Sequence, residues 1–178
     1  MHAVRAHSTS TGAVVGQEAG SSDFNGIFLK LVDEHGEAAQ LMTAVRAGSS
    51  AESRKNLYPS LRTALLAHEK TESSILYGEL GRYPSLASIV ETHKQEADEL
   101  EATIRALDAI DFESEAWLPR FTELCDLVQQ HVREEQDDFF PAALSALGPT
   151  MSADLRDAYV RAKPGFINSI EADSPTAM

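Results

Sequence analysis

Apolar residues recur every three to four positions along four long segments of the chain. This period gives each helix one apolar stripe, which must be buried against neighbouring helices. Clusters of glycine, proline or serine separate the segments, which we expect at about residues 23–46, 53–80, 84–110 and 114–147. No segment shows the period-two alternation of a strand. The sequence therefore predicts an all-α fold, an up-down-up-down antiparallel four-helix bundle with short loops.

The segments outside the predicted bundle carry weaker patterns. Residues 1–22 are interrupted throughout by glycine, serine and threonine, and we expect a flexible N-terminal tail there. The bundle itself takes up residues 23–147. Residues 148–178 should hold one short extra helix, at about 152–162, and a loose C-terminal tail. The first 22 residues lack the apolar run of a secretory signal, so we expect a cytoplasmic protein.

Charge and cysteine content exclude several classes of partner. With 28 acidic and 15 basic side chains the net charge is -13, which repels nucleic acid and anionic lipid. No stretch approaches the roughly 18 consecutive apolar residues of a membrane span. The single cysteine, Cys125, excludes an intrachain disulfide and a thiolate-rich zinc motif. We therefore expect neither nucleic acid nor membrane as a partner.

Six polar side chains interrupt the apolar stripes on faces that should point inward. All are of types that bind metal ions: His35, His68, Glu72, His93, His131 and Glu135. Two His-Glu pairs are spaced four residues apart, which places both members on one helix face, one turn apart. Nearby, Glu134, Gln136 and Asp137 are expected on a solvated face.

The spacing of these residues along the chain tests whether they meet. In an up-down bundle, two positions at the same height are equidistant from the loop that joins their helices. The midpoint of His35 and His68 falls at 51–52, that of Glu72 and His93 at 82–83, and that of His93 and His131 at 112. Each midpoint lies in a predicted turn. The spacing alone predicts that all six side chains share one layer.

A layer of this kind requires positive charge. Burying an unpaired carboxylate costs several kcal/mol or forces it to take up a proton. The inner stripes carry no lysine or arginine near the layer. Metal cations would supply the charge, and six ligands exceed what one tetrahedral zinc needs. Two carboxylates can instead bridge two ions with two histidines each, a donor set that suits iron or manganese. Without metal, the six residues would be a buried polar network in a structural or interaction module.

The motifs resemble the hemerythrin family in its broad HHE form. The resemblance rests on LVDEH with His35, HEKTE with His68 and Glu72, ETHKQ with His93, and HVREEQDDFFP with His131 and Glu135. It covers about residues 23–145. It implies a non-haem centre of two iron ions with an oxo or hydroxo bridge, in which the two glutamates also bridge. Manganese or zinc are possible substitutes for the iron.

The sequence departs from the respiratory hemerythrins at two positions. Their third helix carries a second histidine four residues after the first, where Ala97 stands here, and their last helix supplies an aspartate where Glu135 is the match. The chain is more similar to bacterial HHE proteins and to the animal iron sensor that shares the domain. That sensor has a glutamate directly after the second-helix histidine, which makes Glu69 a possible extra ligand. The missing histidine implies an open coordination site.

Two functions follow from this resemblance. The first is binding of O2 or NO, or reaction with peroxide, at the open site. The alternative is an iron-sensing or iron-donating protein whose stability or partner binding depends on metal loading. No acid-base residue beyond the ligands identifies an enzymatic reaction. The sequence identifies neither a protein partner, an electron donor nor an oligomeric state.

Overall fold

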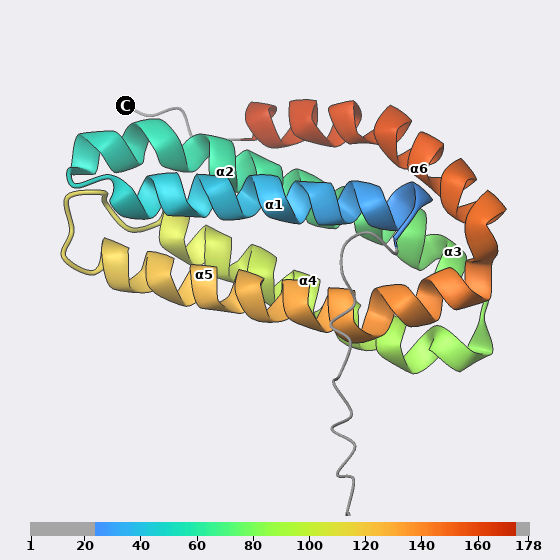
Figure 1. Cartoon of the computed structure of the whole chain (residues 1–178). Helices are drawn as coiled ribbons and strands as arrows, with labels where there is room; N and C mark the ends of the chain where they lie inside the picture. Colours follow the sequence, from blue (N-terminus) through green and yellow to red (C-terminus); the bar gives the residue numbers. More distant parts are fainter. Residues whose placement is uncertain (1–23, 174–178) are drawn as a thin grey trace, which may run out of the picture.

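A computed structural model of the chain describes residues 24–173, and every regular element within that range is helical. The predicted all-α class is confirmed. Four long helices lie lengthwise beside one another (Figure 1). They are α1 (Gly26–Ala47), α2 (Ala51–Glu72), α4 (Ala87–Asp108) and α5 (Trp117–Glu134). The expected tail at 1–22 lies outside the described residues.

Local sequence signals explain where the helices begin. Ser50 caps α2, because its hydroxyl accepts a hydrogen bond of 3.1 Å from the Ser53 amide. The short 3-10 turn η3 (Pro84–Leu86) leads into α4, with the proline at its first position. Gly26 starts α1 with φ +56, a backbone conformation that glycine adopts without strain. A side chain there would also collide with Ser152.

Two of the long helices continue through a π-helical stretch. After α2 come η2 (Ser73–Tyr77) and α3 (Gly78–Leu80), and after α5 comes η4 (Glu135–Phe139). One π stretch begins directly after Glu72 and the other begins at Glu135. Each stretch shifts the helical register locally, and such stretches are frequent at functional sites. The apolar period gives no sign of them.

The last helix, α6 (Phe140–Ala172), corrects the expectation of a short extra helix and loose tail. It turns at Gly148 (φ 73, ψ 169), and its second half lies along α1 and α2 (Figure 1). Pro164 and Gly165 both favour an end of the helix near this point. The helix instead continues because Ile170 is buried in the core, 5% exposed, and this packing outweighs the weak local propensity.

The apolar core is divided into two clusters. The first cluster includes Leu61, Leu100 and Phe121. The second cluster includes Phe28, Leu76 and Phe140. On α1 the second cluster ends at Leu31 and the first resumes at Ala38. The same interruption recurs on α4, between α2 and its continuation η2, and between α5 and its continuation η4, so one polar layer crosses the whole bundle between the two clusters.

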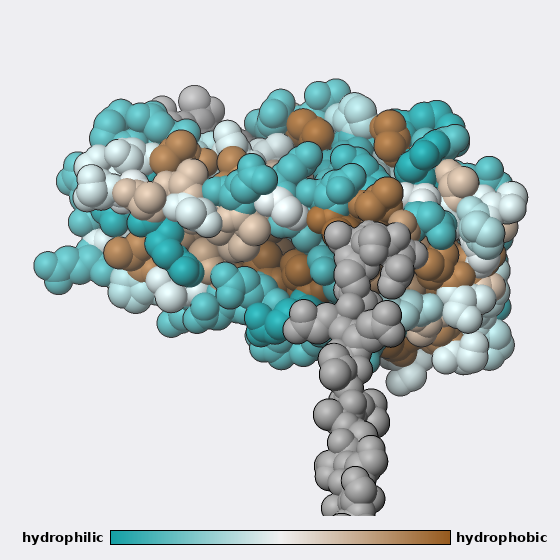
Figure 2. Space-filling model, in the orientation of Figure 1, coloured by the Kyte–Doolittle hydropathy of each residue, from teal (hydrophilic) through white to brown (hydrophobic). Residues whose placement is uncertain are grey.

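The exterior is mainly polar on the face shown in Figure 2, where apolar residues form small separate patches. Within residues 24–173, no helix is long and apolar enough to cross a membrane.

Candidate metal centre

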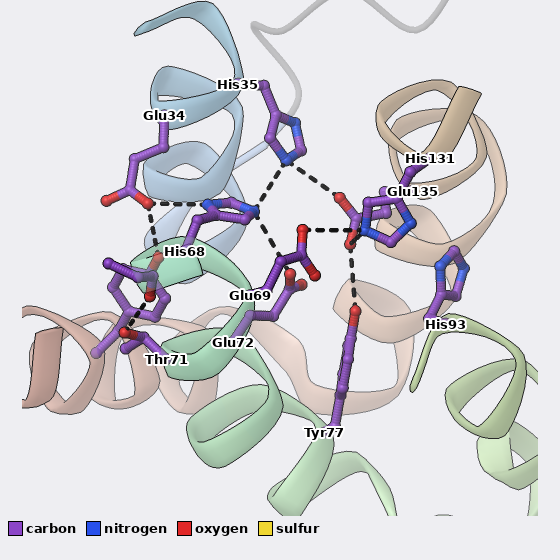
Figure 3. A network of polar contacts seen from close by, with 12 residues as sticks. Glu34, His35, His68, Glu69, Thr71, Glu72, Tyr77, His93, His131 and Glu135 are labelled. Carbon is purple, nitrogen blue, oxygen red and sulfur yellow. Dashed lines mark hydrogen bonds and ion pairs between the residues drawn. The ribbon is translucent and has the colours of Figure 1, made fainter. Parts of the chain in front are cut away.

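The six residues predicted to share a layer lie close to one another (Figure 3). Along the helices they fall between the two apolar clusters. His35 comes from α1, His68 and Glu72 from α2, and His93 from α4. His131 lies on α5, and Glu135 opens the π stretch η4 that follows it. All six are buried, with Glu72 and Glu135 fully inaccessible to solvent.

Glu135 stands at the centre of this layer. Its Oε2 lies 3.1 Å from His35 Nε2, and its Oε1 lies 3.4 Å from His131 Nε2. His35 Nε2 is also 3.3 Å from His68 Nε2. Two sets of potential ligand atoms result, each with all atoms within 4.8 Å of one another: His35, His68 and Glu135, and His93, His131 and Glu135. The two carboxylate oxygens of Glu135 therefore face two different histidine pairs.

Glu72 has the least satisfied side chain of the layer. Neither of its carboxylate oxygens has a hydrogen-bond partner. Its Oε2 lies 3.5 Å from His68 Nε2. Burial raises the pKa of Glu72 well above its ordinary value, and the negative charge of Glu135 raises it further. The pKa of Glu135 is raised well above its ordinary value too, chiefly by burial and then by the charge of Glu69.

Glu69 also reaches this layer, although it follows His68 directly in the chain. It is 6% exposed, and its Oε1 lies 3.5 Å from His131 Nε2. The other oxygen, Oε2, has no hydrogen-bond partner. Burial raises the pKa of this carboxyl. Glu69 lines a surface pocket together with Ala97, the position at which respiratory hemerythrins carry a further histidine.

The histidines are held in the neutral form that binds metal. Burial lowers the pKa of His35 to about 3, and the neighbouring His131 lowers it further. Burial likewise lowers the pKa of His93 to about 4. The pKa values of His68 and His131 are also lowered by burial. Each imidazole thus keeps a ring nitrogen with a free lone pair near neutral pH.

Outer polar residues contact the Nδ1 atoms of all four histidines. Glu34 Oε2 lies 2.9 Å from His68 Nδ1, and the side-chain amide nitrogen of Gln136 lies 2.9 Å from His35 Nδ1. One oxygen of Glu96, Oε2, lies 3.0 Å from Nδ1 of His93 and 3.1 Å from Nδ1 of His131. Such contacts orient imidazole ligands. Sequence reasoning did not identify Glu34, Glu96 or Gln136.

Gln136 was expected on a solvated face, and that expectation is wrong. The residue is half-buried and its amide contacts His35. The reason is the π stretch η4, which begins at Glu135 and rotates the following residues relative to an ideal α-helix. In the same region, Tyr77 from η2 donates a hydrogen bond of 3.4 Å to Glu135 Oε1.

These residues fit metal cations. The buried acceptor atoms without a hydrogen-bond partner include Glu69 Oε2, both oxygens of Glu72, and Glu135 Oε2. Within residues 24–173, none of these three carboxylates is paired with a lysine or an arginine. Buried carboxylates without a cation are costly, and neutral imidazoles converge on the same point. Metal cations would satisfy both groups at once.

A helical bundle with a buried layer of imidazoles and carboxylates defines a class of cation-binding helical proteins. A family model of the hemerythrin HHE cation binding domain matches residues 27–143. The chain therefore belongs to the hemerythrin HHE family, and the resemblance noted from its motifs is confirmed. No curated protein and no solved structure matches the chain. The matched region ends before the turn at Gly148, so the second half of α6 lies outside it.

Proposed function

We propose that the chain is a non-haem di-iron protein that binds O2 or NO, or reacts with peroxide, at a carboxylate-bridged centre. The observation that carries the proposal is the position of Glu135 between two histidine pairs, one oxygen facing each. His35 and His68 would hold one iron, and His93 and His131 the other. Glu135 and Glu72 would bridge them, with Glu69 as a possible extra ligand.

The proposed topology is the antiparallel up-down-up-down bundle expected from the sequence. It is supported by the sequence colours in Figure 1, which run in opposite directions along α1 and α2, and again along α4 and α5. Short turns at 48–50 and around 81–86 are consistent with this order. It places one histidine pair on each helix pair.

Iron would supply Lewis-acid and redox chemistry at this position. The donor set of imidazole and carboxylate suits iron, with manganese or zinc as possible substitutes. The protein residues hold and orient that metal: Glu34, Glu96 and Gln136 fix the imidazole rings from outside. The two apolar clusters on either side keep bulk water away. A reducing cytoplasmic location would suit ferrous iron and the free thiol of Cys125.

The space beside the centre supports a very small ligand. A cavity of about 30 Å³ is bordered by the polar residues His35, His68 and His131, and by apolar residues such as Leu65 and Val128. This volume is about that of one water molecule in the liquid, far below the roughly 300 Å³ or more of pockets for drug-sized ligands. A diatomic gas or peroxide fits such a space better than a larger substrate.

The test is the metal content of protein purified from iron-supplemented cells, followed by anaerobic reduction and addition of NO, O2 or peroxide. We expect two iron ions per chain, the absorption of an oxo-bridged diferric centre, and a spectral change with at least one ligand. Glu135→Gln should lose most of the iron, whereas Glu99→Gln, an exposed glutamate on α4, should keep it. Protein that stays free of metal in iron-rich medium would refute the proposal.

The unpaired buried carboxylates also favour the second candidate function, an iron-responsive or iron-donating protein. Because Glu72 and Glu69 lack cationic partners within the described residues, removing the metal should destabilise the fold. A protein of this kind would change stability or partner binding with its iron supply. Equal melting temperatures for the metal-free and iron-loaded forms would contradict this function without contradicting the first.

A further inference from the structure

The second half of α6 contacts the candidate centre, although it lies outside the family's matched region. The contact runs through Glu34, a buried glutamate on α1. Glu34 Oε2 accepts a hydrogen bond of 2.6 Å from the Tyr159 hydroxyl, and Lys163 Nζ lies 2.5 Å from the same oxygen. The Nδ1 of His68 is 2.9 Å from it.

One carboxylate oxygen thus joins α6 to a candidate ligand on α2. The other oxygen of Glu34, Oε1, pairs with Lys30 Nζ at 3.1 Å. With Lys30 and Lys163 beside it, Glu34 is the buried glutamate of this region whose charge is matched by cationic side chains. It is therefore suited to accept a hydrogen bond from an imidazole, in contrast to Glu72, which has no such partner.

The same half of α6 is fixed to the bundle at points on either side of this contact. Near its start, the Ser152 hydroxyl donates a hydrogen bond of 3.0 Å to the Asn25 carbonyl oxygen, in the close approach that Gly26 permits. Near its end, Ile170 is buried in the apolar core. Tyr159 lies between them and is fully buried. The helix is held so that its polar side chains meet Glu34.

The other histidine pair has a different support. His93 and His131 share Glu96, which belongs to α4 within the matched region. Within residues 24–173, Glu96 makes no hydrogen bond or ion pair with the part of α6 beyond residue 149. The two halves of the proposed centre therefore depend on different parts of the chain.

We propose that Tyr159 and Lys163 are positioning residues of the metal centre: by holding Glu34 against His68 Nδ1, they direct His68 Nε2 toward the metal. The inference rests on the proposed di-metal centre and deepens it. Its consequence is an asymmetry. The position held by His35 and His68 requires the docked second half of α6, and the position held by His93 and His131 does not.

The experiment is an anaerobic Fe²⁺ titration of the full chain, wild type against the double variant Tyr159→Phe/Lys163→Met. We expect two tight equivalents in the wild type. In the double variant we expect one equivalent weakened by about 10–100-fold, the usual effect of losing an outer contact to a ligand, and one unchanged. Tyr159→Phe alone removes a single hydroxyl and should weaken the same equivalent less. This milder variant keeps the test decisive if the double variant folds poorly.

Two matched controls separate positioning from general destabilisation. Arg161→Met removes an exposed cation from the same helix. Tyr58→Phe removes another buried hydroxyl, whose 3.0 Å hydrogen bond goes to Asp108 beside the first apolar cluster. Both should bind two equivalents as tightly as the wild type, even if Tyr58→Phe lowers the melting temperature.

A second readout follows the His68 ring itself. In the Zn²⁺-loaded protein, a long-range 1H–15N spectrum should show His68 with its proton on Nδ1, and the double variant should weaken or lose that signal. Unchanged binding of both equivalents by the double variant, or equal weakening of both, would overturn the inference alone. A wild type that binds no metal would instead refute the proposed centre, and the inference with it.

Discussion

Replacing Glu72 by glutamine should have opposite effects on the metal-free and metal-loaded protein. Glu72 is fully buried, both of its oxygens lack hydrogen-bond partners, and Glu135 adds a second negative charge nearby. In the metal-free protein this carboxyl destabilises the folded state, and glutamine, which has almost the same shape, would remove that destabilisation. In the loaded protein the same substitution removes a proposed bridging ligand.

The magnitude follows from linkage between protonation and folding. The pKa of Glu72 is raised in the folded state, so above its ordinary value of 4.5 the unfolded state gives up a proton that the folded state retains. Each pH unit in that window costs the folded state up to about 1.4 kcal/mol. The contribution of Glu72 to the stability of the metal-free protein should therefore become less favourable as pH rises above 4.5, and the wild type should fall progressively below Glu72→Gln. Allowing for the buried amide that glutamine leaves, we expect a net gain of about 1–2 kcal/mol at pH 7.

Thermal unfolding of chelator-stripped protein, followed by circular dichroism, measures this gain. For a chain of this size we expect Glu72→Gln to raise Tm by roughly 2–8 °C at pH 7, and by almost nothing at pH 4.5. The iron-loaded variant should bind less metal and melt below the loaded wild type.

Glu34→Gln is the control, because Glu34 is a buried carboxylate that already has cationic partners in Lys30 and Lys163. Removing its charge should destabilise the metal-free protein by about 3–5 kcal/mol. If metal-free Glu72→Gln is destabilised as much as Glu34→Gln at every pH, Glu72 already has the compensating contacts that Glu34 has, and the layer does not lack positive charge.

Three further predictions concern the rest of the layer. Glu96→Gln should weaken one Fe²⁺ equivalent by about 10–100-fold, because Glu96 contacts both His93 and His131; two unchanged equivalents in a titration would contradict this. The metal-free protein should lose stability as pH falls from about 4.5 toward 3, below the range in which Glu72 acts, because the unfolded chain has protonated its histidines while His35 and His93 stay neutral to about 3 and about 4. Acid titration by circular dichroism tests it, and a flat profile in that range would count against neutral imidazoles. Glu69→Gln should speed iron release to a chelator if Glu69 is a ligand, and an unchanged release rate would assign it a structural role.

The sequence predicted well which side chains would lie together, because the candidate ligands are polar residues that interrupt the apolar stripes of the helices. A histidine or glutamate on an apolar stripe is conspicuous, and the spacing of His35 and His68 about a predicted turn is a geometric constraint that few arrangements satisfy. Conversely, Glu34 and Glu96 could not be predicted. They are acidic residues at positions where a solvated face is the ordinary outcome, and their role depends on which histidine nitrogen comes within reach after folding.

Two structural features could not be predicted from the sequence for a different reason. A π stretch changes the register of a helix by about one residue, which leaves the apolar period almost intact while moving Gln136 toward His35. The length of α6 was not predicted because Pro164 and Gly165 disfavour a helix locally, and the burial of Ile170 that outweighs them exists only after folding. Both errors arise where tertiary packing decides against local propensity, and both occur at residues that contact the candidate centre or cover it.

The arrangement of ligands on the helices explains why the proposed centre needs two ions. His35 and His68 come from α1 and α2, while His93 and His131 come from α4 and α5, so each ion would join the two helices of one pair. Each bridging glutamate would then join the two pairs, since Glu72 belongs to α2 and Glu135 follows α5. The polar layer lies between the two apolar clusters, so its side chains make the contacts between helices at this height. Metal bound in this layer would hold the four helices together at mid-height, as the packing of apolar side chains does on either side of it.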